Sequence, residues 1–158
     1  MFRGSYPAKV DEKSRLKLPA DFKLLVDARP VAHFYITSED GRSAQIWPMP
    51  EWMEREKILA KHDMDEAVEI YIEATSYYGQ QVQIDGQGRL LLPQILRSAA
   101  NLKDDVVVLG KTKYLEVVNR EDFEARLKAR PFTGEHRQRV AQIFQAENDK
   151  ADGQKAQS

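Results

Sequence analysis

Residues 80–93 have the polar and apolar pattern of two short strands joined by a tight turn. The first five residues, QQVQI, alternate as a strand with one buried face does. Gly86 and Gly88 allow the positive φ that a chain reversal requires, and the next four residues form the expected return strand. Pro93 then stands where a helix can begin, because proline lacks only an amide hydrogen that is unpaired there.

The same pattern occurs earlier in the chain, so the sequence contains an internal repeat. Residues 10–20 read VDEKSRLKLPA and residues 84–94 read IDGQGRLLLPQ. Asp, Arg, Leu, Leu and Pro are identical at a constant offset of 74 residues, where about one identity would arise by chance. Looser matches continue through two further apolar strands to a helix. The chain is therefore predicted to be a tandem duplication of one small β-rich unit.

The repeat and the linker composition predict the domain organisation. We place the first unit at residues 7–53, linker helices at 54–81 and the second unit at 82–125. The linker has apolar residues at helical spacing. Residues 126–147 are expected to form a C-terminal helical segment. Residues 148–158 are small and polar, which predicts a disordered tail. The expected fold class is α+β and β-rich.

The composition is that of an ordinary globular protein, with 42% hydrophobic residues and no cysteine. The absence of cysteine excludes disulfides and thiolate metal sites. No run approaches the roughly 18 apolar residues that span a bilayer, and the N-terminus lacks the apolar core of a signal peptide. We therefore expect a cytoplasmic protein without a membrane partner.

The formal net charge is only −1, so binding to nucleic acid would require a local concentration of positive charge. Residues 3–23 carry more basic than acidic side chains. The basic ones are Arg3, Lys9, Lys13, Arg15, Lys17 and Lys23, and the acidic ones are Asp11, Glu12 and Asp21. Many of the balancing acids lie in residues 51–73. Charge is thus segregated along the chain, although a purely solvated surface also tolerates this arrangement.

An Asp-x-x-x-Arg motif lies at each predicted hairpin tip, at Asp11–Arg15 and Asp85–Arg89. In one interpretation it is structural, and the carboxylate caps turn amides or pairs with the guanidinium. In the other, the arginine faces outward and binds phosphate or guanine in the major groove of DNA. The two are compatible, since the aspartate can hold the turn while the arginine points outward. The first turn has more basic neighbours in the sequence, so we expect it to dominate phosphate contact.

The opening MFRG, the two turns, the paired Leu-x-Leu-Pro segments and the linker helix resemble the MraZ family over about residues 1–145. The resemblance implies a pseudo-two-fold swapped-hairpin β-barrel made from two AbrB-like units with flanking helices. It also implies a nucleoid-associated transcriptional regulator that acts as a ring-shaped homo-oligomer. Its partner would be double-stranded DNA, bound at short direct repeats in the promoter of the cell-division and cell-wall operon.

The resemblance also assigns roles to individual residues. It places Arg15, Arg89, Arg3 and Lys13 on the DNA-binding face, and the basic cluster around Arg15 adds Lys9 to the expected DNA-binding residues. The hairpin pattern itself gives the expected turn-stabilising residues, which are Asp11, Asp85, Gly86 and Gly88. The family commonly has glycine before the arginine of the first turn, where this chain has Ser14. A left-handed φ at that position would cost serine about 1 kcal/mol relative to glycine.

No feature of the sequence predicts an enzyme. His33, His62 and His136 lie far apart in the sequence and not at metal-ligand spacing, and no nucleophile motif occurs. We therefore expect no metal, cofactor or small-molecule substrate. Trp47 and Trp52 are expected in the core or at subunit contacts. The alternative function is an oligomeric scaffold or protein-interaction ring without specific DNA binding, in which the Asp–Arg turns only stabilise hairpins or subunit contacts.

Overall fold

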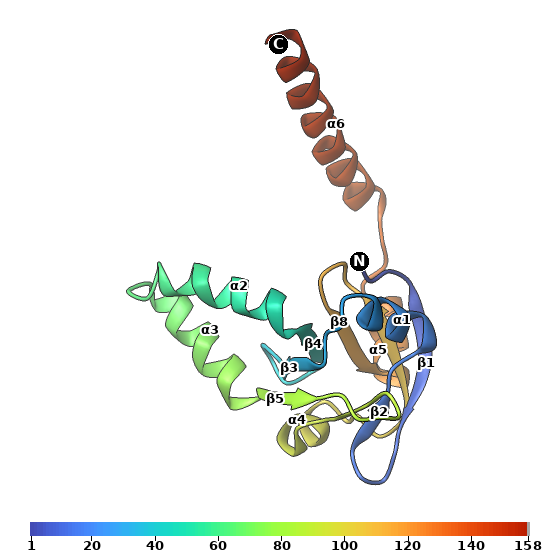
Figure 1. Ribbon diagram of the computed structural model, residues 1–158. Coiled ribbons are helices and arrows are strands. Elements are labelled where there is room, and N and C mark those ends of the chain that lie inside the picture. Colours follow the sequence, from blue (N-terminus) through green and yellow to red (C-terminus); the bar gives the residue numbers. More distant parts are fainter. Residues whose placement is uncertain (158) are drawn as a thin grey trace. The chain divides into compact units, whose positions relative to one another are not determined.

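The computed structural model describes residues 1–157 (Figure 1). It divides into a barrel part, Met1–Phe123, and a C-terminal part that begins at Glu124. The strands are β1 (Ser5–Val10), β2 (Arg15–Lys17), β3 (His33–Thr37), β4 (Ala44–Pro48), β5 (Gln80–Gln83), β6 (Arg89–Leu91), β7 (Asp104–Gly110) and β8 (Leu115–Asn119). The helices are α1 (Ala20–Ala28), α2 (Met49–Ala60), α3 (Glu66–Tyr77), α4 (Gln94–Ala99), α5 (Arg120–Ala129) and α6 (Gly134–Gln157).

The eight strands form one antiparallel sheet in the order β5-β3-β4-β8-β7-β1-β2-β6. Strands of the first repeat pair mainly with strands of the second, since β1 pairs with β7, β2 with β6, β3 with β5 and β4 with β8. The two edge strands β5 and β6 are joined by a tight turn, in which the Asp85 amide donates to the Arg89 carbonyl at 3.0 Å. The sheet is therefore a nearly closed barrel, and the predicted swapped-hairpin fold is confirmed.

Two strand pairs lie on a pseudo-two-fold axis that relates the repeats. Leu16 pairs with Leu90 in the β2·β6 ladder, and these residues occupy equivalent positions of the repeat. Gln45 pairs in the same way with its equivalent Glu116 in the β4·β8 ladder. Each repeat thus completes the sheet of the other, which neither can do alone because a two-stranded hairpin buries too little apolar surface.

The repeated Leu-x-Leu segments supply the centre of the core. Leu16 and Leu90 have no exposed surface, and Leu18 and Leu92 are almost as fully buried. Alternate side chains of a strand face opposite sides of the sheet. The residues between these leucines therefore point out of the barrel.

Prolines precede the two short helices that follow the Leu-x-Leu segments. Pro19 and Pro93 are the N-cap residues of α1 and α4, so Pro93 lies one position earlier than the first helical position predicted for it from the sequence. Both keep an extended ψ while their carbonyls accept the first helical hydrogen bonds, from the Lys23 and Arg97 amides. Proline suits this place because its fixed φ fits the cap and it has no amide hydrogen to satisfy.

The linker forms α2 and α3, which lie side by side next to the barrel (Figure 1). Asp65 caps α3 by accepting a hydrogen bond from the Ala67 amide. Arg55 of α2 donates to the Tyr71 hydroxyl of α3 at 2.7 Å and lies over the Trp47 ring. Trp47 is buried, as is Trp52 of α2. None of the helices within residues 1–157 is long and apolar enough to cross a membrane.

The C-terminal part is more helical than the sequence predicted. The expected disordered tail at 148–158 is wrong for the residues described, because α6 continues to Gln157, while Ser158 lies outside them. Alanine, glutamine and lysine in this segment have high helix propensity. Contacts one turn apart add to it, since Gln145 donates to Asp149 at 2.9 Å and Lys150 lies 3.5 Å from Glu147. The prediction from small and polar residues was wrong because it left this helix propensity out.

Candidate nucleic-acid interface

The first Asp-x-x-x-Arg turn is held by the carboxylate of Asp11. Its Oδ1 accepts hydrogen bonds from the amides of Lys13 and Arg15, each at 2.9 Å. Its Oδ2 accepts from Nε of the Arg15 side chain at 2.8 Å. The hydrogen bond from the Arg15 amide, reinforced by its side chain and the Lys13 amide, holds the pKa of Asp11 below its ordinary value, although partial desolvation opposes this.

The second turn repeats this geometry. Oδ1 of Asp85 accepts from the amides of Gln87 and Arg89 at 2.9 Å, and Oδ2 accepts from Arg89 Nε at 2.8 Å. The pKa of Asp85 is lowered by the same set of hydrogen bonds, led by that from the Arg89 amide. The contacts that the structural interpretation requires are therefore present in both turns.

The backbone of the two turns is also matched, with one difference in residue type. Ser14 has φ of 65° and Gly88, at the equivalent position, has φ of 76°. The first turn therefore places a serine in the left-handed region, where a side chain is strained. Gly86 was expected to supply a second positive φ, and this is wrong, since its φ lies outside that region. One left-handed residue is enough in each turn, because the aspartate carboxylate accepts hydrogen bonds from two backbone amides and so holds the rest of the turn.

Each motif arginine keeps donor groups for another ligand. A guanidinium carries five N–H donors, and the aspartate of the same turn engages only Nε. No second partner of Arg15 or Arg89 is found among residues 1–157, and their side chains are 31% and 25% exposed. The aspartate thus fixes the orientation of the side chain, and the two terminal nitrogens are left for an external acceptor.

The β2·β6 ladder brings the two arginines onto one face. Arg15 lies directly opposite Leu91, and Lys17 lies directly opposite Arg89. All four side chains point out of the barrel, and we call them the outer patch. The arginines are diagonal neighbours, which places them roughly 7–8 Å apart at the backbone. Two arginines that lie 74 residues apart in the sequence thus share one compact surface.

The swapped pairing also changes which turn has basic neighbours. Lys17, from the first repeat, faces Arg89, and Cε of Lys23 would lie 3.2 Å from a Cβ added at Gly88. The first turn receives Arg97 from the second repeat, whose Nη2 donates to the Asp11 carbonyl at 3.3 Å. The basic neighbours of the first turn in the sequence therefore do not set it apart, because each turn lies beside basic residues of the other repeat.

The remaining predicted contact residues lie at different distances from the outer patch. Lys13 is exposed at the tip of the first turn. Lys9 is exposed on β1, directly opposite Asp105 of β7. Arg3 precedes β1 at the end away from the turn. With a rise of about 3.3 Å per residue along this strand, Arg3 lies roughly 20 Å from the turn. The structure does not bring Arg3 to the patch.

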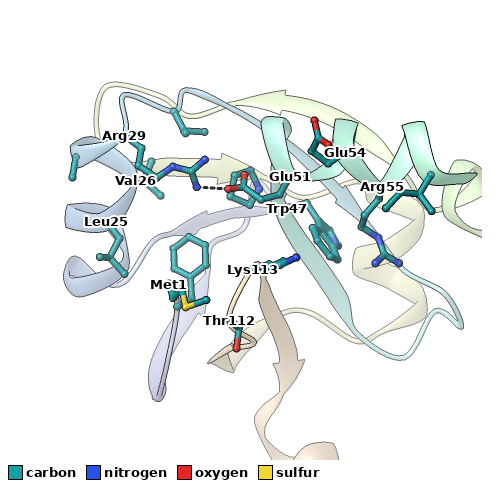
Figure 2. Close-up of a pocket in the computed structure, with 15 residues that line it drawn as sticks. Met1, Leu25, Val26, Arg29, Trp47, Glu51, Glu54, Arg55, Thr112 and Lys113 are labelled. Atoms are coloured by element: carbon teal, nitrogen blue, oxygen red, sulfur yellow. Dashed lines mark ion pairs between the residues drawn. The ribbon is translucent and has the colours of Figure 1, made fainter. Parts of the chain in front are cut away.

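A groove occupies another surface of the barrel part, between α1, α2 and the β7–β8 turn (Figure 2). Its volume is about 590 Å³, and apolar side chains including Leu25, Val26 and Ile58 line it. The Arg29–Glu51 ion pair links α1 to α2 across it. No residue of the outer patch lines this groove.

The fold and the paired turns define a class of protein, a barrel of two interleaved repeats with one arginine-bearing face. The comparisons identify the family within it. The family model described as "MraZ protein, putative antitoxin-like" matches residues 79–141. The transcriptional regulator MraZ of Acidobacterium capsulatum is 48% identical over 144 residues, which cover 90% of this chain and 99% of that protein. That of Koribacter versatilis is 39% identical with the same coverage. The chain belongs to the MraZ family.

Proposed function

We propose that this protein is a transcription regulator that binds double-stranded DNA through the outer patch. The role in transcription follows from family membership, since both relatives named above are transcriptional regulators. The observation that supports the DNA contact is the placement of Arg15 and Arg89. Both are oriented by an aspartate through Nε alone and lie on one outward face.

The shape of the patch suits the major groove. Its two layers, Arg15 with Leu91 and Lys17 with Arg89, lie two residues apart along the strands, or about 7 Å. A two-stranded ribbon fits the major groove, which is about 12 Å wide. A guanidinium held by Nε presents its two terminal nitrogens as a fork, which matches two phosphate oxygens or the O6 and N7 acceptors of guanine.

The modest charge of one subunit favours multivalent binding. We propose that several copies assemble into a ring and that each outer patch contacts one of several short direct repeats in the promoter of the cell-division and cell-wall operon. Individually weak contacts then gain from effective concentration. Exposed apolar side chains on the two helices that border the groove support association between copies, namely Leu24, Leu25, Met53 and Ile58.

Footprinting of the full-length protein on that promoter tests the proposal. Protection of regularly spaced short boxes is expected, with steep loss of binding when the boxes are reduced to one. Equal affinity for one box and for several would contradict the multivalent mode. The ring is tested separately by the solution mass, which Ile58→Glu should lower. Ile70→Glu, on an exposed position of α3 outside the groove, is the matched control.

The Asp–Arg ion pairs also favour a second candidate, an oligomeric scaffold whose turns are purely structural. The two candidates differ in what Arg15→Ala changes. If Arg15 is a DNA-binding residue, Arg15→Ala lowers the affinity for the promoter and leaves the solution mass unchanged. In a scaffold it alters the mass, and no specific protection of DNA is observed with the wild-type protein.

A further inference from the structure

Leu91 is an exposed apolar residue in the middle of the outer patch. Its exposed fraction is 52%, although leucines on either side of it, Leu90 and Leu92, are buried. It faces Arg15 across the ladder, and Arg89 lies two residues away on the same face of β6. An isobutyl group at this place makes no hydrogen bond to phosphate, so it needs a different partner from its basic neighbours.

The pseudo-two-fold symmetry of the patch is broken at this residue. The axis that relates Arg15 to Arg89 relates Lys17 to Leu91, since both pairs are separated by 74 residues. The backbone and the arginines are therefore matched in the two halves, while an ammonium group in one half is replaced by an apolar group in the other. A ligand on this face meets two chemically different ends.

The major groove of DNA offers one apolar group that matches Leu91. Each base pair displays a distinct set of donors and acceptors there, and only thymine adds a C5-methyl group. The two layers of the patch are about 7 Å apart, close to two base-pair steps of about 3.4 Å. When the arginines engage phosphate or guanine, the leucine lies at the level of a neighbouring base edge.

We propose that Leu91 recognises a thymine through contact with its C5-methyl group, and that the difference between Leu91 and Lys17 fixes the direction of the subunit on DNA. The proposal rests on the proposed function, because it requires the outer patch to face the major groove. It adds a determinant of sequence and of polarity, which two equivalent arginines cannot supply.

Replacement of thymine by deoxyuridine removes only the methyl group and tests this contact. Each thymine of a footprinted promoter box is replaced in turn, and affinity is measured with the full-length protein. The wild type should lose about fourfold in affinity at one position of the box, the effect of one buried methyl group. Leu91→Ala should bind the unmodified box more weakly and show no further loss at that position. Leu91→Lys should also lose the deoxyuridine effect, while its affinity depends more steeply on salt.

Ile70→Ala is the matched control, because Ile70 is an exposed aliphatic residue of α3 outside both the outer patch and the groove. It should keep the full deoxyuridine effect. An equal deoxyuridine penalty in the wild type and in Leu91→Ala overturns the proposal, as does a wild type insensitive at every thymine. A change in solution mass on Leu91→Ala, with the deoxyuridine profile intact, assigns Leu91 to a subunit contact and also overturns it. If the wild type protects no box at all, the proposed function itself fails, a result distinct from these.

Discussion

Ser14 and Gly88 occupy equivalent left-handed positions of the two turns, so exchanging their residue types should change the stability of the fold in opposite directions. Ser14→Gly should stabilise the fold, because relief of a left-handed φ gains about 1–2 kcal/mol. The added freedom of glycine in the unfolded chain costs about 0.5–1 kcal/mol. The lost contact of the Ser14 hydroxyl with Gln94 is long, at 3.4 Å, and its removal costs about 0.5 kcal/mol at most. The midpoints of these ranges leave an expected net gain of about 0.5 kcal/mol.

The reverse change, Gly88→Ser, should destabilise by about 1 kcal/mol. The added Cβ would lie 3.2 Å from Cε of Lys23. This atom is near the end of a flexible chain and can move aside, so the backbone dominates the cost. Urea unfolding at fixed protein concentration measures both variants, since association between copies would otherwise shift the midpoints. A neutral Gly88→Ser together with a destabilised Ser14→Gly would refute the claim that the two turns share one strained backbone.

Three further outcomes follow from the same contacts. Because the folded-state pKa of Asp11 and of Asp85 is lowered, these carboxylates stabilise the fold above their unfolded pKa of about 3.9, and this contribution is lost as pH falls through the lowered value. Asp11→Asn should therefore reduce the urea midpoint at pH 7, and its difference from the wild type should shrink in acid. Leu16→Ala should cost about 2–5 kcal/mol in the same assay because Leu16 is fully buried, whereas Leu91→Ala on the outer face should stay within about 0.5 kcal/mol. Lys17→Ala should reduce the slope of log affinity against log salt by about 1 for each bound subunit, measured by DNA titration across salt concentrations.

Short sequence patterns predicted those features that depend only on neighbouring residues in the chain. The repeated Leu-x-Leu segments predicted buried leucines with outward neighbours, since the alternation of a strand applies whatever its partner is. Comparison with the family pattern, in which glycine precedes the first arginine, predicted a strained turn at Ser14, because the φ of a tight turn depends mainly on that turn. The recurrence of the Leu-x-Leu segments and of the Asp-x-x-x-Arg turns predicted two similar halves, and the family resemblance added the swapped-hairpin barrel.

The surroundings of the candidate site depend on strand pairing, which local patterns do not specify. Lys17 faces Arg89 only because β2 pairs with β6 of the other repeat, and Arg97 reaches Asp11 for the same reason. The cluster of basic residues in the sequence wrongly grouped Arg3 with the turn, because an extended strand carries neighbouring residues apart quickly. If Leu16 is paired with its repeat equivalent Leu90 on a two-fold axis, Lys17 falls opposite Arg89, as the structure has it.

The central claim is that the two arginines form one shared DNA-contacting face. The most direct test is a mobility-shift titration of Arg15→Ala, Arg89→Ala and the control Arg42→Ala on the same promoter duplex at fixed salt. Arg42 is exposed in the β3–β4 loop, outside the outer patch. Both motif variants should lose affinity to a similar extent, by about 1–3 kcal/mol each, while the control matches the wild type. Unchanged affinity in both motif variants would contradict the account.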